Sequence, residues 1–61
     1  MGNFDWQGRI LQDGVNVAGV FSKSRDILLQ ELRHYASIYS EDGPVILEIR
    51  EGKRKWKVYK P

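Results

Sequence analysis

Cations and aromatic residues alternate near the end of the chain, in the segment Lys53-Arg54-Lys55-Trp56-Lys57-Val58-Tyr59-Lys60. Lysine and arginine neutralise phosphate groups and aromatic rings stack on bases, so this composition suits nucleic-acid binding. The charge is concentrated there: residues 43–61 sum to +4 (six cations, two carboxylates), whereas residues 1–21 and 22–42 each sum to −1. The segment is therefore the first candidate for a binding surface.

Two further interpretations of this segment are open. Lysines on an edge strand prevent edge-to-edge aggregation, and the same charges can bind an acidic protein. If the segment binds nucleic acid or an acidic protein, the predicted binding residues are Arg9, Arg50, Lys53, Lys55, Lys57 and Tyr59.

Residues suited to catalysis or metal binding are few. The chain has no cysteine and one histidine, His34. A nucleophilic site needs a nucleophile, a base and an orienting acid, and a zinc site needs about four ligands, of which His34 and Glu31 supply at most two. We therefore expect a protein that is not an enzyme, with no metal site and no cofactor.

Residues 4–21 are predicted to form a β-hairpin. Apolar residues alternate on both sides of Asp13-Gly14, a preferred pair for a two-residue type I′ turn. Two glycines that face each other across the hairpin would leave room for a helix. The pairs that this turn predicts are Gln12 with Val15, Ile10 with Val17, Gly8 with Gly19 and Trp6 with Phe21.

A helix is predicted from about Ser24 to Ser40, with Ser24 or Ser22 as its N-cap and Asp42-Gly43-Pro44 ending it. At 100° per residue its apolar stripe is formed by Leu28, Leu32, Tyr35 and Tyr39, with Leu29 and Ala36 beside them.

A second candidate surface lies on another side of this helix. Ile27, Glu31, His34 and Ile38 follow one line, with spacings of four, three and four residues. Two exposed isoleucines on so small a protein would form a dimer interface or a docking strip. Alternatively, the sheet is wide enough to cover them at its margin.

Residues 44–60 predict a second hairpin that turns at Glu51-Gly52. This turn places Leu47 opposite Trp56 and Glu48 opposite Lys55, an opposite-charge pair. The remaining expected pairs are Arg50 with Lys53, Ile49 with Arg54 and Val45 with Val58. Trp56 would then face the core and the lysines would face outward.

The elements combine into one α+β domain, residues 1–61, in the order β-β-α-β-β. The simplest arrangement is one four-stranded antiparallel sheet made of two hairpins, with the helix packed on one face and the other face open. No apolar run approaches the roughly 20 residues of a membrane span, and no signal peptide is visible. With no cysteine, we expect a cytoplasmic protein without membrane contact. The core of so short a chain is small, which leaves self-association open as a further source of stability.

The segment Arg33-His34-Tyr35-Ala36-Ser37-Ile38-Tyr39-Ser40-Glu41-Asp42-Gly43-Pro44-Val45 resembles part of short uncharacterised proteins of bacterial and phage or prophage genomes. In these a helix ending HYA-x-x-Y leads through DGPV into a strand. The resemblance covers roughly a quarter of the chain, implies no assigned activity and transfers no functional residue. It implies a phage-encoded accessory protein, a kind that often binds and blocks a host protein, including components of antiviral defence.

Two functions are therefore predicted. The first is a non-enzymatic binding module whose basic hairpin and open sheet face contact nucleic acid or an acidic protein surface. The second is a protein-interaction or inhibitor module, as a monomer or a homodimer, that uses the helix strip or the apolar part of the open face. No small-molecule substrate is expected for either.

Overall fold

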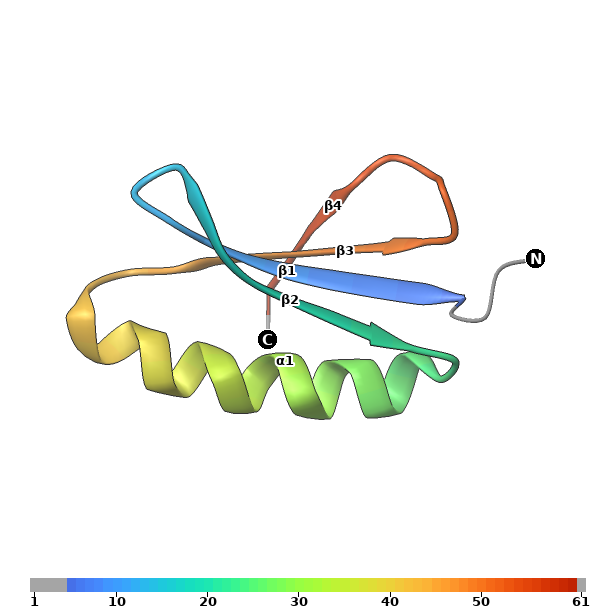
Figure 1. The fold of residues 1–61 in the computed structure, drawn as a ribbon, viewed down its shortest axis with the longest axis horizontal. Helices are drawn as coiled ribbons and strands as arrows, with labels where there is room; N and C mark the ends of the chain where they lie inside the picture. The colour runs from blue at the N-terminus through green and yellow to red at the C-terminus, as the bar shows by residue number, and fades with distance from the viewer. Residues whose placement is uncertain (1–4, 61) are drawn as a thin grey trace.

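The computed structural model describes residues 5–60 and shows, over that range, one four-stranded antiparallel sheet with a single α-helix on one face (Figure 1). The elements in chain order are β1 (Trp6–Gln12), β2 (Val15–Ser22), α1 (Arg25–Tyr39), a 3-10 turn η1 (Ser40–Asp42), β3 (Ile46–Glu51) and β4 (Lys57–Tyr59). The strands lie in the order β2-β1-β3-β4. The predicted fold class and element order are confirmed.

Helix α1 begins where the sequence predicts. The Ser24 hydroxyl accepts a hydrogen bond from the Ile27 amide at 3.4 Å and so caps the first turn. At the other end, the Gln12 side-chain amide donates to the carbonyl oxygens of Tyr39, at 2.9 Å, and Gly43, at 3.2 Å. One side chain of β1 therefore bonds the last carbonyl of α1 and a carbonyl of the loop that follows it.

Gln12→Ala is expected to lower the free energy of unfolding by about 1–2 kcal/mol, because it removes both hydrogen bonds from a partly buried site. Urea denaturation followed by circular dichroism measures this change. Gln30→Ala is the matched control: Gln30 is exposed on α1, and its replacement should be neutral within about 0.5 kcal/mol. Equal effects of the two substitutions would contradict this role for Gln12.

The first hairpin has the predicted turn but a different register beyond it. Asp13 and Gly14 have φ values of +54° and +78°, as a type I′ turn requires, and Gln12 pairs with Val15. A β-bulge between Ile10 and Leu11 then leaves Val17 as the extra residue of β2. Three predicted pairs are therefore wrong: Ile10 lies opposite Ala18 rather than Val17, Gly8 opposite Val20 rather than Gly19, and Trp6 opposite Ser22 rather than Phe21.

Beyond the bulge, each side chain of β2 lies on the opposite face of the sheet from the one predicted. Val20 is buried beneath the helix, whereas Phe21 is exposed. Gly8 does face the helix as predicted, because a Cβ atom there would lie 3.2 Å from both δ carbons of Leu32. Gly19, in contrast, is exposed and contributes nothing to the seat of the helix.

The predicted two-residue turn of the second hairpin is wrong. The connection runs from residue 52 to residue 56, and β4 pairs with β3 three residues later than predicted. A shift by an odd number of residues turns each side chain to the other face of the sheet. The observed pairs are Leu47 with Tyr59, Glu48 with Val58 and Ile49 with Lys57.

The core lies between the helix and the middle of the sheet, and its members are Ile10, Val20, Leu28, Leu32, Ala36, Leu47 and Ile49. Tyr35, predicted in the apolar stripe, is 43% exposed instead. The helix packs mainly over β1 and β2, so β3 and β4 are covered less. In the described part of the chain, no helix is both long and apolar enough to cross a membrane.

Candidate functional site

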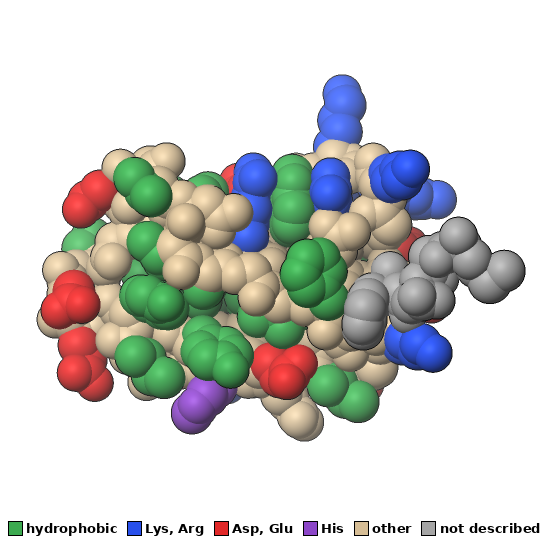
Figure 2. Space-filling model, in the orientation of Figure 1, with side chains coloured by type: hydrophobic (Ala, Val, Ile, Leu, Met, Phe, Trp, Pro, Cys, Tyr) green, Lys and Arg blue, Asp and Glu red, His purple; other side chains and the backbone are tan. Residues whose placement is uncertain are grey.

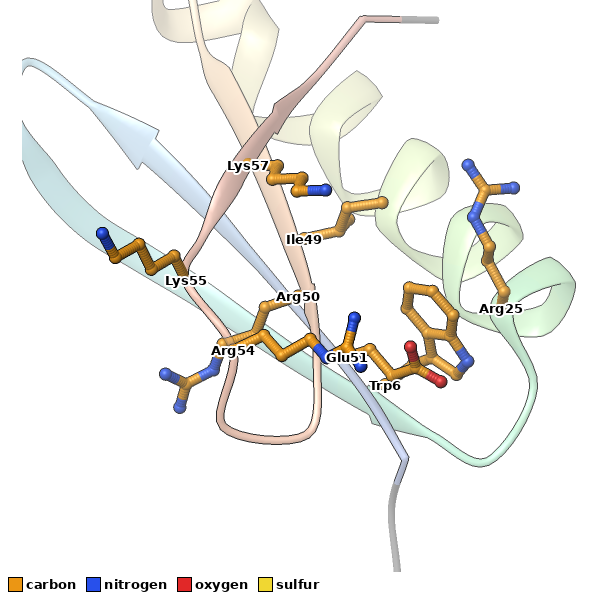
Figure 3. Close-up of a pocket in the computed structure, with 8 residues that line it drawn as sticks. All are labelled: Trp6, Arg25, Ile49, Arg50, Glu51, Arg54, Lys55 and Lys57. Atoms are coloured by element: carbon orange, nitrogen blue, oxygen red, sulfur yellow. The ribbon is translucent and has the colours of Figure 1, made fainter.

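A hollow of about 220 Å³ opens beside the end of β3, on the face of the sheet that carries the helix (Figure 3). We call it the basic hollow. Its lining residues are Trp6, Arg25, Ile49, Arg50, Glu51, Arg54, Lys55 and Lys57.

The lining of the basic hollow is strongly positive. It contains five cations and one carboxylate, a sum of +4. The whole chain sums to +2, so all other residues together sum to −2. Figure 2 shows the same asymmetry, with Lys and Arg side chains toward the right-hand end of the view and several Asp and Glu side chains at the left-hand end. An anionic ligand is therefore attracted to one end of the molecule.

The position of the helix creates the hollow. Because α1 lies over β1 and β2, the helix-side face of β3 opens toward solvent near its end. Lys57 pairs with Ile49 and so stands on that same face. Strand β2 ends at Ser22, opposite Trp6, and α1 therefore begins with Arg25 at this end of the sheet.

Two apolar side chains form the inner part of the hollow. Ile49 belongs to the core, and Trp6 is half-buried and packs against it. The guanidinium carbon of Arg25 lies 5.9 Å from the centroid of the Trp6 ring, near the outer limit of about 6 Å for a cation–π contact. The hollow thus combines a partly exposed aromatic ring with cations at its rim.

The connection between β3 and β4 supplies part of this rim. Gly52 has a φ of +60°, and its amide donates to the carbonyl of Asp5 at 2.7 Å. The Arg54 amide donates to the carbonyl of Glu51 at 3.1 Å. These bonds tie the start of the loop to the sheet, and the loop then carries the side chains of Arg54 and Lys55 to the hollow.

The open face of the sheet has a different character. Trp56, predicted to face the core, lies instead with two guanidinium groups over its ring, from Arg9 at 4.3 Å and Arg50 at 4.5 Å from the ring centroid. Cation–π contacts of this kind contribute about 0.5–2 kcal/mol each. They offer a physical reason for the longer loop, which frees Trp56 to reach the arginines.

Both arginines also have polar partners on this face. Arg9 forms an ion pair with Glu48 at 2.6 Å, across β1 and β3. Arg50 donates from Nε and Nη2 to the Gln7 side-chain oxygen, at 3.0 and 2.9 Å. The opposite-charge partner predicted for Glu48 was Lys55, and the structure replaces it with Arg9. These arginines are therefore largely engaged within the protein.

The structure does not bring the six predicted binding residues onto one surface. Arg9 lies on the open face, whereas Lys57 and Tyr59 stand on the helix-side face and Tyr59 packs against the core. Lys53 and Lys55 are exposed on the loop. The residues from this set that line the basic hollow are Arg50, Lys55 and Lys57.

Five residues of the hollow were absent from the prediction: Trp6, Arg25, Ile49, Glu51 and Arg54. Arg54 belongs to the basic segment, but the predicted register placed it opposite Ile49 on the inner face. Arg25 immediately follows the N-cap, and the order β-β-α returns the helix start to the Trp6 end of the sheet. The proximity of Arg25 to Trp6 could therefore have been predicted from the sequence.

The helix strip, defined as Ile27, Glu31, His34 and Ile38, is exposed along its whole length. Ile27 is 53% and Ile38 50% exposed, so the alternative that the sheet covers them is wrong. The His34 ring makes an edge contact with Tyr35, at 5.4 Å between ring centroids. A binding role for the strip stays a prediction.

No group of three His, Cys, Asp or Glu side chains that could hold a metal ion occurs within residues 5–60. Comparisons with protein-family models, with curated proteins and with solved structures found no match to this chain. The resemblance of residues 33–45 to phage and prophage proteins therefore stays a prediction, and the function is argued from the site alone.

Proposed function

We propose that this protein is a small, non-enzymatic module that binds single-stranded nucleic acid in the basic hollow. One observation carries the proposal: four exposed cations, those of Arg25, Arg54, Lys55 and Lys57, and one carboxylate line a hollow whose inner wall holds a partly exposed tryptophan. Proteins that bind single strands combine a positive groove for the phosphates with aromatic rings on which bases stack.

In this proposal, different side chains of the hollow contact the phosphates and stack on the bases. Arg54, Lys55 and Lys57 are exposed; in Figure 3 Lys57 lies on β4 beside Ile49, and Arg54 and Lys55 extend from the β3–β4 loop, with Lys55 pointing away from Trp6. They are free to follow successive phosphates. The Trp6 ring lies deeper and offers a stacking surface, with Arg25 beside it. Base stacking of this kind is worth about 1–3 kcal/mol per base.

The aromatic ring favours nucleic acid over an acidic protein surface. Carboxylates on a protein need only exposed cations, such as Lys53 and Lys60 at the outside of the hairpin. A concave site with an aromatic wall adds nothing to such a contact, whereas a nucleotide uses the charge and the ring together.

The test is a titration of the protein with labelled single-stranded RNA and DNA, duplex DNA and an acidic peptide, at two salt concentrations. We expect the single strands to bind with an affinity that falls steeply with salt, by a logarithmic slope of about −0.7 for each phosphate bound. An affinity that does not change with salt, or tighter binding of the acidic peptide, would overturn the proposal.

NMR locates the bound strand, because the chain has two indole groups on opposite faces of the sheet. The Trp6 indole N–H signal should shift on titration, since Trp6 lines the hollow. The Trp56 indole serves as the internal control, because its ring is held by Arg9 and Arg50 on the open face. A shift of Trp56 alone would place the strand on the wrong face for this proposal.

A second candidate function, protein interaction through the helix, is favoured by the exposure of Ile27 and Ile38. These isoleucines lie on the flank of α1 away from its buried residues, where they add nothing to the core. An inhibitor of another protein could use them.

A further inference from the structure

We infer that the base held on the Trp6 ring of the basic hollow is a guanine, and that Glu51 and Arg25 select it. The inference rests on the proposed function and deepens it, because it names the preferred base at one position of the bound strand. Glu51 accepts hydrogen bonds from one edge of this base, and Arg25 donates hydrogen bonds to another edge. The residues that set the sequence preference thus differ from those that follow the phosphates.

Glu51 lies beside the ring on which the base stacks. It is the direct partner of Trp6 across β1 and β3, and both side chains line the hollow. Residues that face each other across neighbouring strands have Cβ atoms about 4.5–5.5 Å apart. Figure 3 shows the Glu51 carboxylate next to the Trp6 ring. A base on this ring therefore has a carboxylate at its edge.

This carboxylate is the exception in a positive site. Within the described residues, the hollow is lined by five cations and by one carboxylate, that of Glu51. A carboxylate repels a phosphate, so Glu51 marks a place that the sugar–phosphate backbone avoids. Figure 3 shows the ends of the Arg54 and Lys55 side chains away from this place. The group that meets Glu51 is therefore the base and not the phosphate.

The oxygens of Glu51 are available to a ligand. Among residues 5–60, its carboxylate has neither an ion pair nor a hydrogen bond, although cations line the same hollow. Glu48, the other carboxylate on β3, shows the contrast, because it forms an ion pair with Arg9 at 2.6 Å. Glu51 is exposed, and its two oxygens accept two parallel hydrogen bonds without giving up a contact within the described chain.

Arg25 approaches the same ring from the other side of β1. Trp6 lies opposite Glu51 of β3 on one side and opposite Ser22, the last residue of β2, on the other. Arg25 follows Ser22 by three residues, and its guanidinium carbon lies 5.9 Å from the centroid of the Trp6 ring. The stacking surface is thus flanked by a carboxylate, which only accepts hydrogen bonds, and by a guanidinium, which only donates them.

Guanine is the base whose edges match these two groups. Its Watson–Crick edge carries two adjacent donors, N1–H and the N2 amino group, and its Hoogsteen edge carries two adjacent acceptors, N7 and O6. Adenine and cytosine place one acceptor beside one donor on the Watson–Crick edge, and uracil places its one donor between two carbonyl oxygens. A carboxylate that faces any of these three bases is repelled by a neighbouring acceptor. Guanine alone satisfies both oxygens of Glu51 and both arms of the Arg25 guanidinium.

The experiment compares short RNA strands that differ only in their middle base. Three uridines on each side flank guanosine, adenosine, cytidine or uridine, and fluorescence anisotropy gives each dissociation constant at physiological salt. We expect the guanosine strand to bind about tenfold more tightly than the other three, the discrimination that two hydrogen bonds to one base edge provide.

Two base analogues test the two contacts without any change to the protein. Inosine lacks the N2 amino group, so Glu51 loses one hydrogen bond, and the inosine strand should bind about fivefold more weakly than the guanosine strand. The 7-deaza analogue of guanosine lacks N7, and through its lost contact with Arg25 it should bind about threefold more weakly. Analogues that bind as tightly as guanosine would overturn the inference.

Glu51→Gln connects the preference to the carboxylate. An amide presents one donor beside one acceptor, so it no longer matches two donors, and the tenfold preference for guanosine should fall to within about twofold. Binding of the all-uridine strand should not weaken, because the substitution removes a negative charge from the hollow. Glu41→Gln is the matched control: Glu41 is exposed in η1, loses the same charge, and should leave the preference unchanged.

The outcomes separate this inference from the proposed function. Strands that bind within about twofold of one another, with an affinity that falls with salt, would overturn the guanine site and leave the proposed function standing. A preference for guanosine that Glu51→Gln does not reduce would likewise overturn it. If none of the strands binds, both the inference and the proposed function are wrong.

A free nucleotide distinguishes a strand from a small ligand. Guanosine 5′-monophosphate offers the same base but no neighbouring phosphates for Arg54 and Lys57, so it should bind at least about tenfold more weakly than the guanosine strand. Equal affinities would keep the guanine site but make the hollow a nucleotide site, which would overturn the proposed binding of a strand.

Discussion

Gly8→Val is expected to destabilise the protein by about 2–3 kcal/mol, because it inserts a branched side chain into a filled core. Even a single Cβ atom at Gly8 would lie 3.2 Å from both δ carbons of Leu32 and 3.5 Å from Leu28 Cδ1. Both leucines are completely buried and cannot move aside without displacing their neighbours. A domain of this size has a total stability of about 3–9 kcal/mol, so much of it would be lost.

Gly19→Val is the matched control, and it separates the two registers of the first hairpin. Among residues 5–60, a Cβ atom at Gly19 would meet only the Gly8 carbonyl oxygen, at 3.9 Å. We therefore expect a change of no more than about 0.5 kcal/mol, with valine favoured by its strand propensity. In the register without the bulge, the two glycines would face each other beneath the helix and both substitutions would be costly. Urea unfolding at low protein concentration distinguishes these outcomes, and equal losses of stability would contradict the bulged register.

Local signals explain why the element order was predictable. The Asp13-Gly14 turn depends on two residues that adopt positive φ, and the helix start depends on the Ser24 side chain and the amide of Ile27. Each of these two features involves no more than four consecutive residues of the chain. The apolar spacing of Leu28 and Leu32 likewise identified the buried side of the helix.

The register of each hairpin, in contrast, depends on residues distant in the sequence. In β2 the apolar residues Val17, Ala18, Val20 and Phe21 occupy both faces, so alternation does not determine which face is buried. The bulge is selected by the fit of Val20 beneath the helix. No pattern within the hairpin contains that information.

The predicted register of the second hairpin was wrong for a related reason. The pair Glu48 and Lys55 appeared to support a tight turn, but Arg9 of β1 lies directly opposite Glu48 and takes the ion pair. This partner becomes visible only with the strand order β2-β1-β3-β4. The same order brings Arg9 and Arg50 together, and with them the site that holds Trp56.

The sequence therefore predicted the positive charge of the candidate site but not its shape. The concentration of cations near the end of the chain is a property of the sequence, and three of the six predicted residues line the basic hollow. Its aromatic wall comes from Trp6 and one of its cations from Arg25, which the sheet order and the helix start bring to the same end. The proximity of Trp6 and Arg25 is therefore a property of the tertiary structure.

Reversing charge at the rim of the hollow should nearly abolish binding of single-stranded nucleic acid. Lys57→Glu replaces a cation that would contact a phosphate with a carboxylate that repels it. We expect this substitution to weaken binding about tenfold at physiological salt. With Arg54→Glu added, the affinity should fall about a hundredfold. The logarithmic salt slope should become shallower by about 0.7 for each phosphate that is no longer neutralised. Fluorescence anisotropy with a labelled oligonucleotide measures both quantities.

The matched control for this reversal is Arg33→Glu, which changes the net charge of the protein as Lys57→Glu does. Arg33 is exposed on α1, about 12 Å further along the helix than Arg25, and it does not line the basic hollow. If the hollow is the binding site, Arg33→Glu should weaken binding less than about twofold, the small effect that screened long-range attraction leaves. Equal effects at the two positions would mean that the strand responds to the charge of the whole molecule, and the hollow would then have no part in binding it.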